Sequence, residues 1–87
     1  MNSEEPAGTR ELMEEAAHGR HPSTVSIMKH FAWAHLPEDL QNVSKEFATL
    51  AVRMLSIIPD GPELTAGLRK LLEAKDCMVR AHIDATR

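Results

Sequence analysis

The sequence is poor in cysteine, glycine and aromatic residues, with one, four and three of them among 87 positions. A single cysteine, Cys77, excludes a disulfide within the chain, and this scarcity favours a reducing compartment. So few glycines leave no glycine-rich phosphate loop, and the GxSxG and HExxH motifs are absent as well. The five histidines are not spaced with several cysteines as zinc ligands are. The sequence therefore predicts a protein that is not an enzyme and that carries no metal or other cofactor.

Long apolar runs are also absent. Nowhere do about 18 apolar residues follow one another, which a membrane-spanning helix would require. The first 20 residues lack the basic stretch and the apolar stretch of a secretory signal. We therefore expect no membrane partner and a cytoplasmic location, which would be the host cytoplasm for a phage protein.

Acidic residues dominate only the beginning of the chain. The formal net charge is −3, and residues 1–20 hold five acidic residues against Arg10 and Arg20, whereas the remainder is balanced. A neutral domain lacks the positive field that attracts long nucleic acids, so we expect no duplex nucleic acid partner, and a transcriptional regulator is disfavoured. We predict an acidic, flexible N-terminal arm over residues 1–20, with at most a short helix between Thr9 and His18, and a helical domain over residues 21–87.

Hydrophobic periodicity, together with prolines and glycine that end helices, divides the domain into three predicted helices. Pro22 at a first-turn position starts a shorter helix that we expect to reach Ala34. A second start at Leu36-Pro37-Glu38 precedes a long helix to about Ile58, and the turn 59–62, with two prolines and a glycine, ends it. A last helix runs from Pro62 to about Asp84 and must return antiparallel, because the connection is short. The predicted fold class is all-α: an antiparallel hairpin of two long helices with a preceding shorter helix.

The long helix over residues 38–58 carries more apolar surface than one neighbour can cover. Its main apolar stripe consists of Leu40, Val43, Phe47, Leu50, Met54 and Ile57. Ala48, Val52 and Leu55 lie on an adjoining side. Either the shorter helix covers the second side or another subunit does. Because the chain is small for a stable core, we favour the second alternative and predict a homo-oligomer.

Trp33 and Lys45 are the residues that best fit a ligand. Trp33 is either a core or interface anchor or a surface on which a nucleobase stacks. Lys45 follows on the next helix and offers one charge for a phosphate. On the last helix, Lys75 either extends its ammonium to water past its own methylenes or neutralises an anion in a central pocket, and His82 is most simply a helix C-terminal group.

Four segments resemble the hairpin domain of phage anti-CBASS and anti-Thoeris sponge proteins over about residues 25–83. They are Phe31-Ala32-Trp33-Ala34-His35-Leu36-Pro37, the predicted helix through Leu50-Ala51, Pro59-Asp60-Gly61-Pro62-Glu63 and Leu68-Arg69-Lys70-Leu71-Leu72-Glu73-Ala74-Lys75. The resemblance implies a small helical protein that forms compact homo-oligomers, commonly hexamers. Such proteins sequester cyclic oligonucleotide second messengers without cleaving them, which silences the antiviral effector.

The resemblance also implies site residues. Trp33 matches the position of an aromatic residue that stacks on the nucleobase, and Lys45 or Ser44 matches a residue that holds phosphate, with His35 as a further polar contributor. Gly61-Pro62 stands where the family often has an arginine, so a second anion site would depend on Arg69 or Lys75. The alternative hypothesis is a helical protein-interaction or assembly module that binds no nucleotide.

Overall fold

A computed structural model describes residues 8–87, and 78% of the structure is helical, with no strand among these residues. The elements are α1 (Arg10–Ala16), α2 (Pro22–Met28), a 3₁₀-helix η1 (Lys29–Phe31), α3 (Glu38–Ile57) and α4 (Pro62–Thr86). The all-α prediction is confirmed. The expectation that the first residues form a disordered tail concerns residues 1–7, which lie outside the described part.

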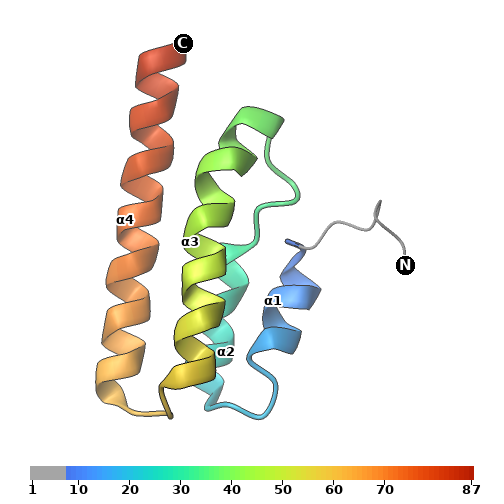
Figure 1. Cartoon of the computed structure of the whole chain (residues 1–87), viewed down its shortest axis with the longest axis vertical. Coiled ribbons are helices and arrows are strands. Elements are labelled where there is room, and N and C mark those ends of the chain that lie inside the picture. The colour runs from blue at the N-terminus through green and yellow to red at the C-terminus, as the bar shows by residue number, and fades with distance from the viewer. Residues whose placement is uncertain (1–7) are drawn as a thin grey trace.

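The two long helices lie side by side, joined by a short connection, with α1 on the other side of α3 (Figure 1). Helix α2 and η1 pack behind them and contact α1, α3 or α4. The C-terminal part of α4 extends beyond the shorter helices (Figure 1). The shorter helices therefore pack against the half of the long helices that lies near the turn joining α3 and α4.

Helix α1 differs from the predicted flexible arm. Its cap is the expected one, because Thr9 Oγ1 accepts a hydrogen bond from the Leu12 amide, 3.1 Å away. Gly19 follows the helix with a φ of 81°, a backbone conformation that favours glycine. Met13 and Ala17 are buried in the same core cluster as α2, α3 and α4. A boundary at residue 20 does not separate an arm from a domain, since residues on both sides share one core.

The shorter helix ends earlier than predicted. His21 caps α2, because its ring Nδ1 accepts a hydrogen bond from the Ser23 amide at 3.1 Å. After η1 the chain becomes extended at Ala32, with a ψ of 140°. Trp33 consequently lies in the connection to α3 and not in a helix. Its backbone amide donates to the Gly8 carbonyl, 2.9 Å away, which ties the start of the chain to this connection.

Helix α3 buries only part of the stripe that its periodicity predicted. The side chains buried on α3 are those of Leu40, Ser44, Ala48, Ala51 and Leu55. Of the predicted stripe, Leu40 is buried and Phe47 packs partly buried against the core. By contrast, Leu50 is 42% exposed and Ile57 is 67% exposed. Small residues at 44, 48 and 51 let neighbouring backbones approach closely on the buried side.

Helix α4 is held to α3 at both ends. Near the turn, Leu64 and Leu68 are buried against the core. At the far end, His82 Nε2 lies 3.1 Å from Asp39 Oδ2, and Arg87 Nη2 lies 3.1 Å from the same oxygen. His82 therefore contacts a neighbouring helix, in addition to its place near a helix end. Cys77, on the second half of α4, is exposed.

Candidate functional site

The structure brings Trp33 and Lys45 together. The Lys45 ammonium lies over the indole, 5.5 Å from the ring centroid, which is a cation–π contact. Trp33 is half-buried and packs on the core cluster, whereas Lys45 is exposed. The connection after η1 places the indole, and the first half of α3 places the lysine. Both predicted ligand groups thus meet at one corner of the bundle, although twelve positions separate them in the chain.

Gly8 covers part of the indole. A Cβ atom on this glycine would overlap the ring carbons and Nε1 of Trp33, so no larger residue fits here without a shift. The Gly8 carbonyl also accepts hydrogen bonds from the Trp33 and Ala34 amides at 2.9 and 3.1 Å. A nucleobase that stacks on this part of the ring must displace Gly8. The indole is therefore both a packing residue and a partly available aromatic surface.

A hollow of about 260 Å³ lies beside the indole. Its apolar lining comes from Met13, Trp33, Ala48 and Val52, and its polar lining from Thr49 and Arg53. Lys45, Thr49 and Arg53 are spaced four residues apart on α3, so they share one side of the helix. The hollow is thus bounded by the Trp33 indole and by one cation, Arg53, whereas Lys45 contacts the indole without lining the hollow. The sequence prediction missed Arg53, although its spacing of eight residues from Lys45, two steps of four, was a visible signal.

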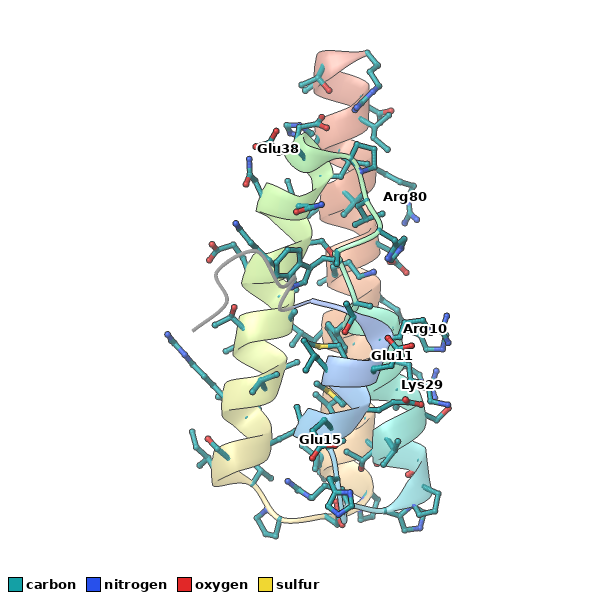
Figure 2. The ribbon with its side chains drawn as sticks, turned by 90° about the vertical axis from the view of Figure 1, so that its right-hand side faces the viewer. Arg10, Glu11, Glu15, Lys29, Glu38 and Arg80 are labelled. Carbon is teal, nitrogen blue, oxygen red and sulfur yellow. The ribbon has the colours of Figure 1, made fainter. Side chains whose placement is uncertain are left out.

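His35 and Ser44 do not line this hollow. His35 is exposed and belongs to a separate depression of about 510 Å³, together with Thr9, Arg10 and Glu11. Figure 2 shows Arg10 and Glu11 pointing outward from α1 on that side of the molecule. Ser44 is fully buried, and its hydroxyl has no hydrogen-bond partner among the described residues. Its predicted role as a phosphate contact is not supported by this placement, because the hydroxyl is closed off from solvent.

We predict that Ser44→Ala leaves the free energy of unfolding unchanged or raises it by about 1 kcal/mol. A buried hydroxyl without a partner carries a desolvation cost, and alanine is also the better helix former. Urea denaturation of both proteins measures the difference. Ser56→Ala, at an exposed position of the same helix, controls for helix propensity. A loss of stability larger than that of Ser56→Ala would show that the Ser44 hydroxyl has a partner after all.

Lys75 and Arg69, the residues of the possible second anion site, have different surroundings. The Lys75 ammonium donates to the His30 carbonyl, 3.2 Å away, and lies 3.1 Å from Asp76 Oδ1. Its charge therefore stabilises the end of η1 and is already paired. Arg69 is exposed on α4. No hollow identified in the described residues contains both side chains, so they remain separate candidates for an anion.

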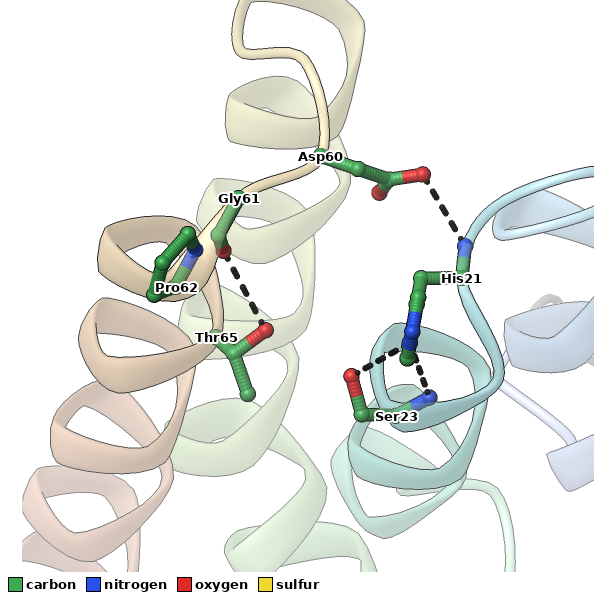
Figure 3. A pocket seen from close by; sticks show the side chains of 6 residues that line it. All are labelled: His21, Ser23, Asp60, Gly61, Pro62 and Thr65. Atoms are coloured by element: carbon green, nitrogen blue, oxygen red, sulfur yellow. Dashed lines mark hydrogen bonds between the residues drawn. The ribbon is translucent and has the colours of Figure 1, made fainter.

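Another hollow, of about 410 Å³, lies where the connection between α3 and α4 meets the start of α2. It is lined by His21, Ser23, Asp60, Gly61, Pro62 and Thr65 (Figure 3). Its polar groups bind one another: Asp60 Oδ2 accepts from the His21 amide at 3.0 Å, and the Thr65 hydroxyl donates to the Gly61 carbonyl at 3.4 Å. The first bond fixes the N-cap residue of α2, and the second lies within the first turn of α4. The polar side chains of this hollow therefore have structural roles in the protein itself.

Arg20 joins the end of α3 to Asp60 beside this hollow, a role that the sequence did not predict. Its Nη1 donates to the Leu55 carbonyl at 2.7 Å, its Nη2 donates to the Ile58 carbonyl, and its Nε lies 3.0 Å from Asp60 Oδ1. Partial burial alone would raise the pKa of the Asp60 carboxyl. Hydrogen bonds from the His21 amide and from Arg20, together with the Arg20 charge, outweigh that effect and hold this pKa below its ordinary value.

The part of the chain that the structure describes contains neither a cluster of metal-ligating side chains nor a membrane-spanning helix. Within residues 8–87, no three or more His, Cys, Asp and Glu side chains are grouped as metal ligands would be. No helix in the same range is both long enough and apolar enough to cross a membrane. The candidate site consists of the Trp33 indole, Lys45 over its ring and the adjoining hollow that Arg53 lines.

Comparisons with known proteins return no family model, no curated protein and no solved structure that matches the chain.

Proposed function

We propose that this protein is a non-enzymatic homo-oligomer that binds cyclic di- or trinucleotide second messengers and sequesters them. The observation that carries the proposal is the Lys45 ammonium 5.5 Å from the Trp33 ring centroid, beside a hollow that Arg53 also lines. A nucleobase needs a flat apolar surface, and its phosphates need cations. Stacking on an aromatic residue is worth about 1–3 kcal/mol per base. The corner at Trp33 offers both within one site.

The resemblance to sponge proteins supports the same proposal. It matches Trp33 to a base-stacking residue and Lys45 to a phosphate contact, and these two residues are neighbours in the structure. Under this proposal the protein keeps the messenger bound and intact, which would block a CBASS-type defence in the cytoplasm of the host. The antiparallel α3 and α4 would form the hairpin of that family, and copies of it would associate, with a hexamer as the expected assembly.

A second candidate is a helical assembly module that binds no nucleotide. It is favoured by the exposed apolar residues of α3, of which Ile57 is 67% exposed and Leu50 is 42% exposed. Contiguous apolar surface on a small protein commonly marks a site for another protein. The two candidates share self-association and differ in whether the corner at Trp33 takes a ligand.

Lys45→Ala is expected to weaken binding of the preferred cyclic nucleotide at least tenfold, because it removes the cation nearest the indole. Trp33 is the only tryptophan, so its fluorescence reports on binding as cyclic di-AMP, cyclic di-GMP and cyclic tri-AMP are titrated. Calorimetry confirms each affinity, because the substitution itself alters the surroundings of the indole.

Lys70→Ala is the matched control, since Lys70 is an exposed lysine on α4 away from the hollow. It should bind as the original protein does. Equal affinities for both variants would contradict the role of Lys45. Recovery of the nucleotide in a linear form after incubation would contradict the non-enzymatic part of the proposal.

A further inference from the structure

The exposed side of α3 has a pattern that suits a second copy of the same chain. With 100° between successive residues, Val43, Leu50 and Ile57 project to one side of the helix, and Glu46 and Arg53 border them along one edge. Leu50 and Ile57 are exposed, as are both charged residues. Among the described residues, neither Glu46 nor Arg53 forms an ion pair. We call Val43, Glu46, Leu50, Arg53 and Ile57 the outer face of α3.

We propose that two copies of this chain associate through the outer face of α3, with the helices antiparallel around a two-fold axis near Leu50. This proposal rests on the self-association included in the proposed function and assigns it a surface. A two-fold axis between positions 49 and 50 brings Glu46 of each copy opposite Arg53 of the other, because the two residues are equally distant from it. It also brings Ile57 next to Val43 of the other copy.

Charge complementarity is the reason to assign a second copy to this surface. The outer face carries one acid and one base on the same edge, about 10 Å apart along the helix. In an antiparallel pair, residues on one edge meet residues on the same edge of the partner helix. The pair therefore forms two oppositely charged contacts and no like-charged contact. An unrelated partner would place no such symmetry on the positions of Glu46 and Arg53.

The neighbouring surface of α4 extends the apolar area. A hollow of about 220 Å³ between the long helices is lined by Met54, Ile58, Leu64, Gly67, Leu68 and Leu71, with Glu63 at its edge. Met78, further along α4, is 53% exposed. The opposite side of the molecule is different, because α1 and η1 carry outward charged side chains there, such as Arg10, Glu15 and Lys29 (Figure 2). Apolar surface is thus concentrated beside the outer face of α3.

Sedimentation equilibrium of the full chain tests this proposal. The original protein is expected to have a mass of at least twice its 9.7 kDa chain mass, and Leu50→Glu is expected to have a smaller mass because it loses this two-fold contact. Leu12→Glu is the matched control, because Leu12 on α1 is 43% exposed but lies away from the outer face. It should associate normally. A single-chain mass for the original protein, or normal association of Leu50→Glu, would overturn the proposal.

Charge reversal tests the two-fold arrangement itself. Glu46→Arg and Arg53→Glu each place like charges opposite one another and should weaken association at least tenfold. The double variant E46R/R53E restores opposite charges and should recover the original dissociation constant. Weakening by the single variants without recovery in the double variant would refute this arrangement. Circular dichroism confirms that each variant is folded. Nucleotide titration distinguishes this proposal from the proposed function, because a protein that associates but binds no nucleotide refutes only the proposed ligand.

Discussion

Arg20→Ala is expected to lower the free energy of unfolding by about 2–4 kcal/mol, the largest effect on stability that we predict for a polar residue. The guanidinium donates to the carbonyls of Leu55 and Ile58, which have no partner at the end of α3 otherwise, and it contacts Asp60. Hydrogen bonds that involve a charged group contribute about 1.5–3 kcal/mol each. Urea denaturation followed by circular dichroism measures the loss.

Arg20→Lys separates the role of the charge from that of the branched guanidinium. Lysine keeps the charge but cannot donate to three acceptors in one plane, so we expect an intermediate loss. Arg10→Ala, at an exposed position on α1, should change stability little. A loss for Arg20→Ala no larger than that for Arg10→Ala would contradict the capping role.

The pH dependence of stability provides an independent test of the contact between Arg20 and Asp60. The pKa of Asp60 is lower in the folded protein than its ordinary value, so the contact stabilises the fold fully above the unfolded-state pKa of about 3.9. As the pH falls through the folded pKa, the carboxyl becomes protonated and that contribution is lost. Asp60→Asn should therefore show a shallower loss of stability at acid pH than the original protein.

Trp33→Ala is expected to weaken nucleotide binding by about 10- to 100-fold, which corresponds to the loss of one or two stacking contacts. The association state should not change, because the indole itself is not part of the outer face of α3, although Arg53 borders both surfaces. Calorimetry measures the affinity, and sedimentation measures the mass. Trp33→Phe retains a flat ring and should bind with intermediate strength.

The opposite result for Trp33→Ala has a definite meaning. If the variant loses its association and the original protein shows no affinity for cyclic nucleotides, then the indole is an interface anchor. Its half-buried position against the core cluster is compatible with such a role. Circular dichroism distinguishes both outcomes from simple unfolding of the variant.

Local signals in the sequence predicted the helices well. The prolines at 22 and 62, the acids after Pro37 and the glycine at 19 act through their own backbone or through nearest neighbours, and each marks an observed helix boundary. The end of the shorter helix was misplaced because tertiary contacts decide it: the amides of Trp33 and Ala34 bind Gly8, which lies far away in the chain. No local pattern reports such a contact.

The buried side of α3 was misjudged for a related reason. Hydrophobicity favours the large residues at 47, 50 and 57, but the buried side combines Leu40 and Leu55 with the small residues at 44, 48 and 51, and it leaves Leu50 and Ile57 exposed. Periodicity identifies an apolar stripe without showing which neighbour covers it. The juxtaposition of Trp33 and Lys45 was foreseen, whereas the burial of Ser44 and the capping role of Arg20 depend on packing that spacing alone does not reveal.

Calorimetric titration of the full chain with cyclic di- and trinucleotides tests the central proposal most directly. The account predicts saturable binding of at least one of them, with the nucleotide recovered intact afterwards by chromatography. A folded, associated protein that releases no heat with any of these nucleotides, and whose tryptophan fluorescence stays constant throughout, would contradict it.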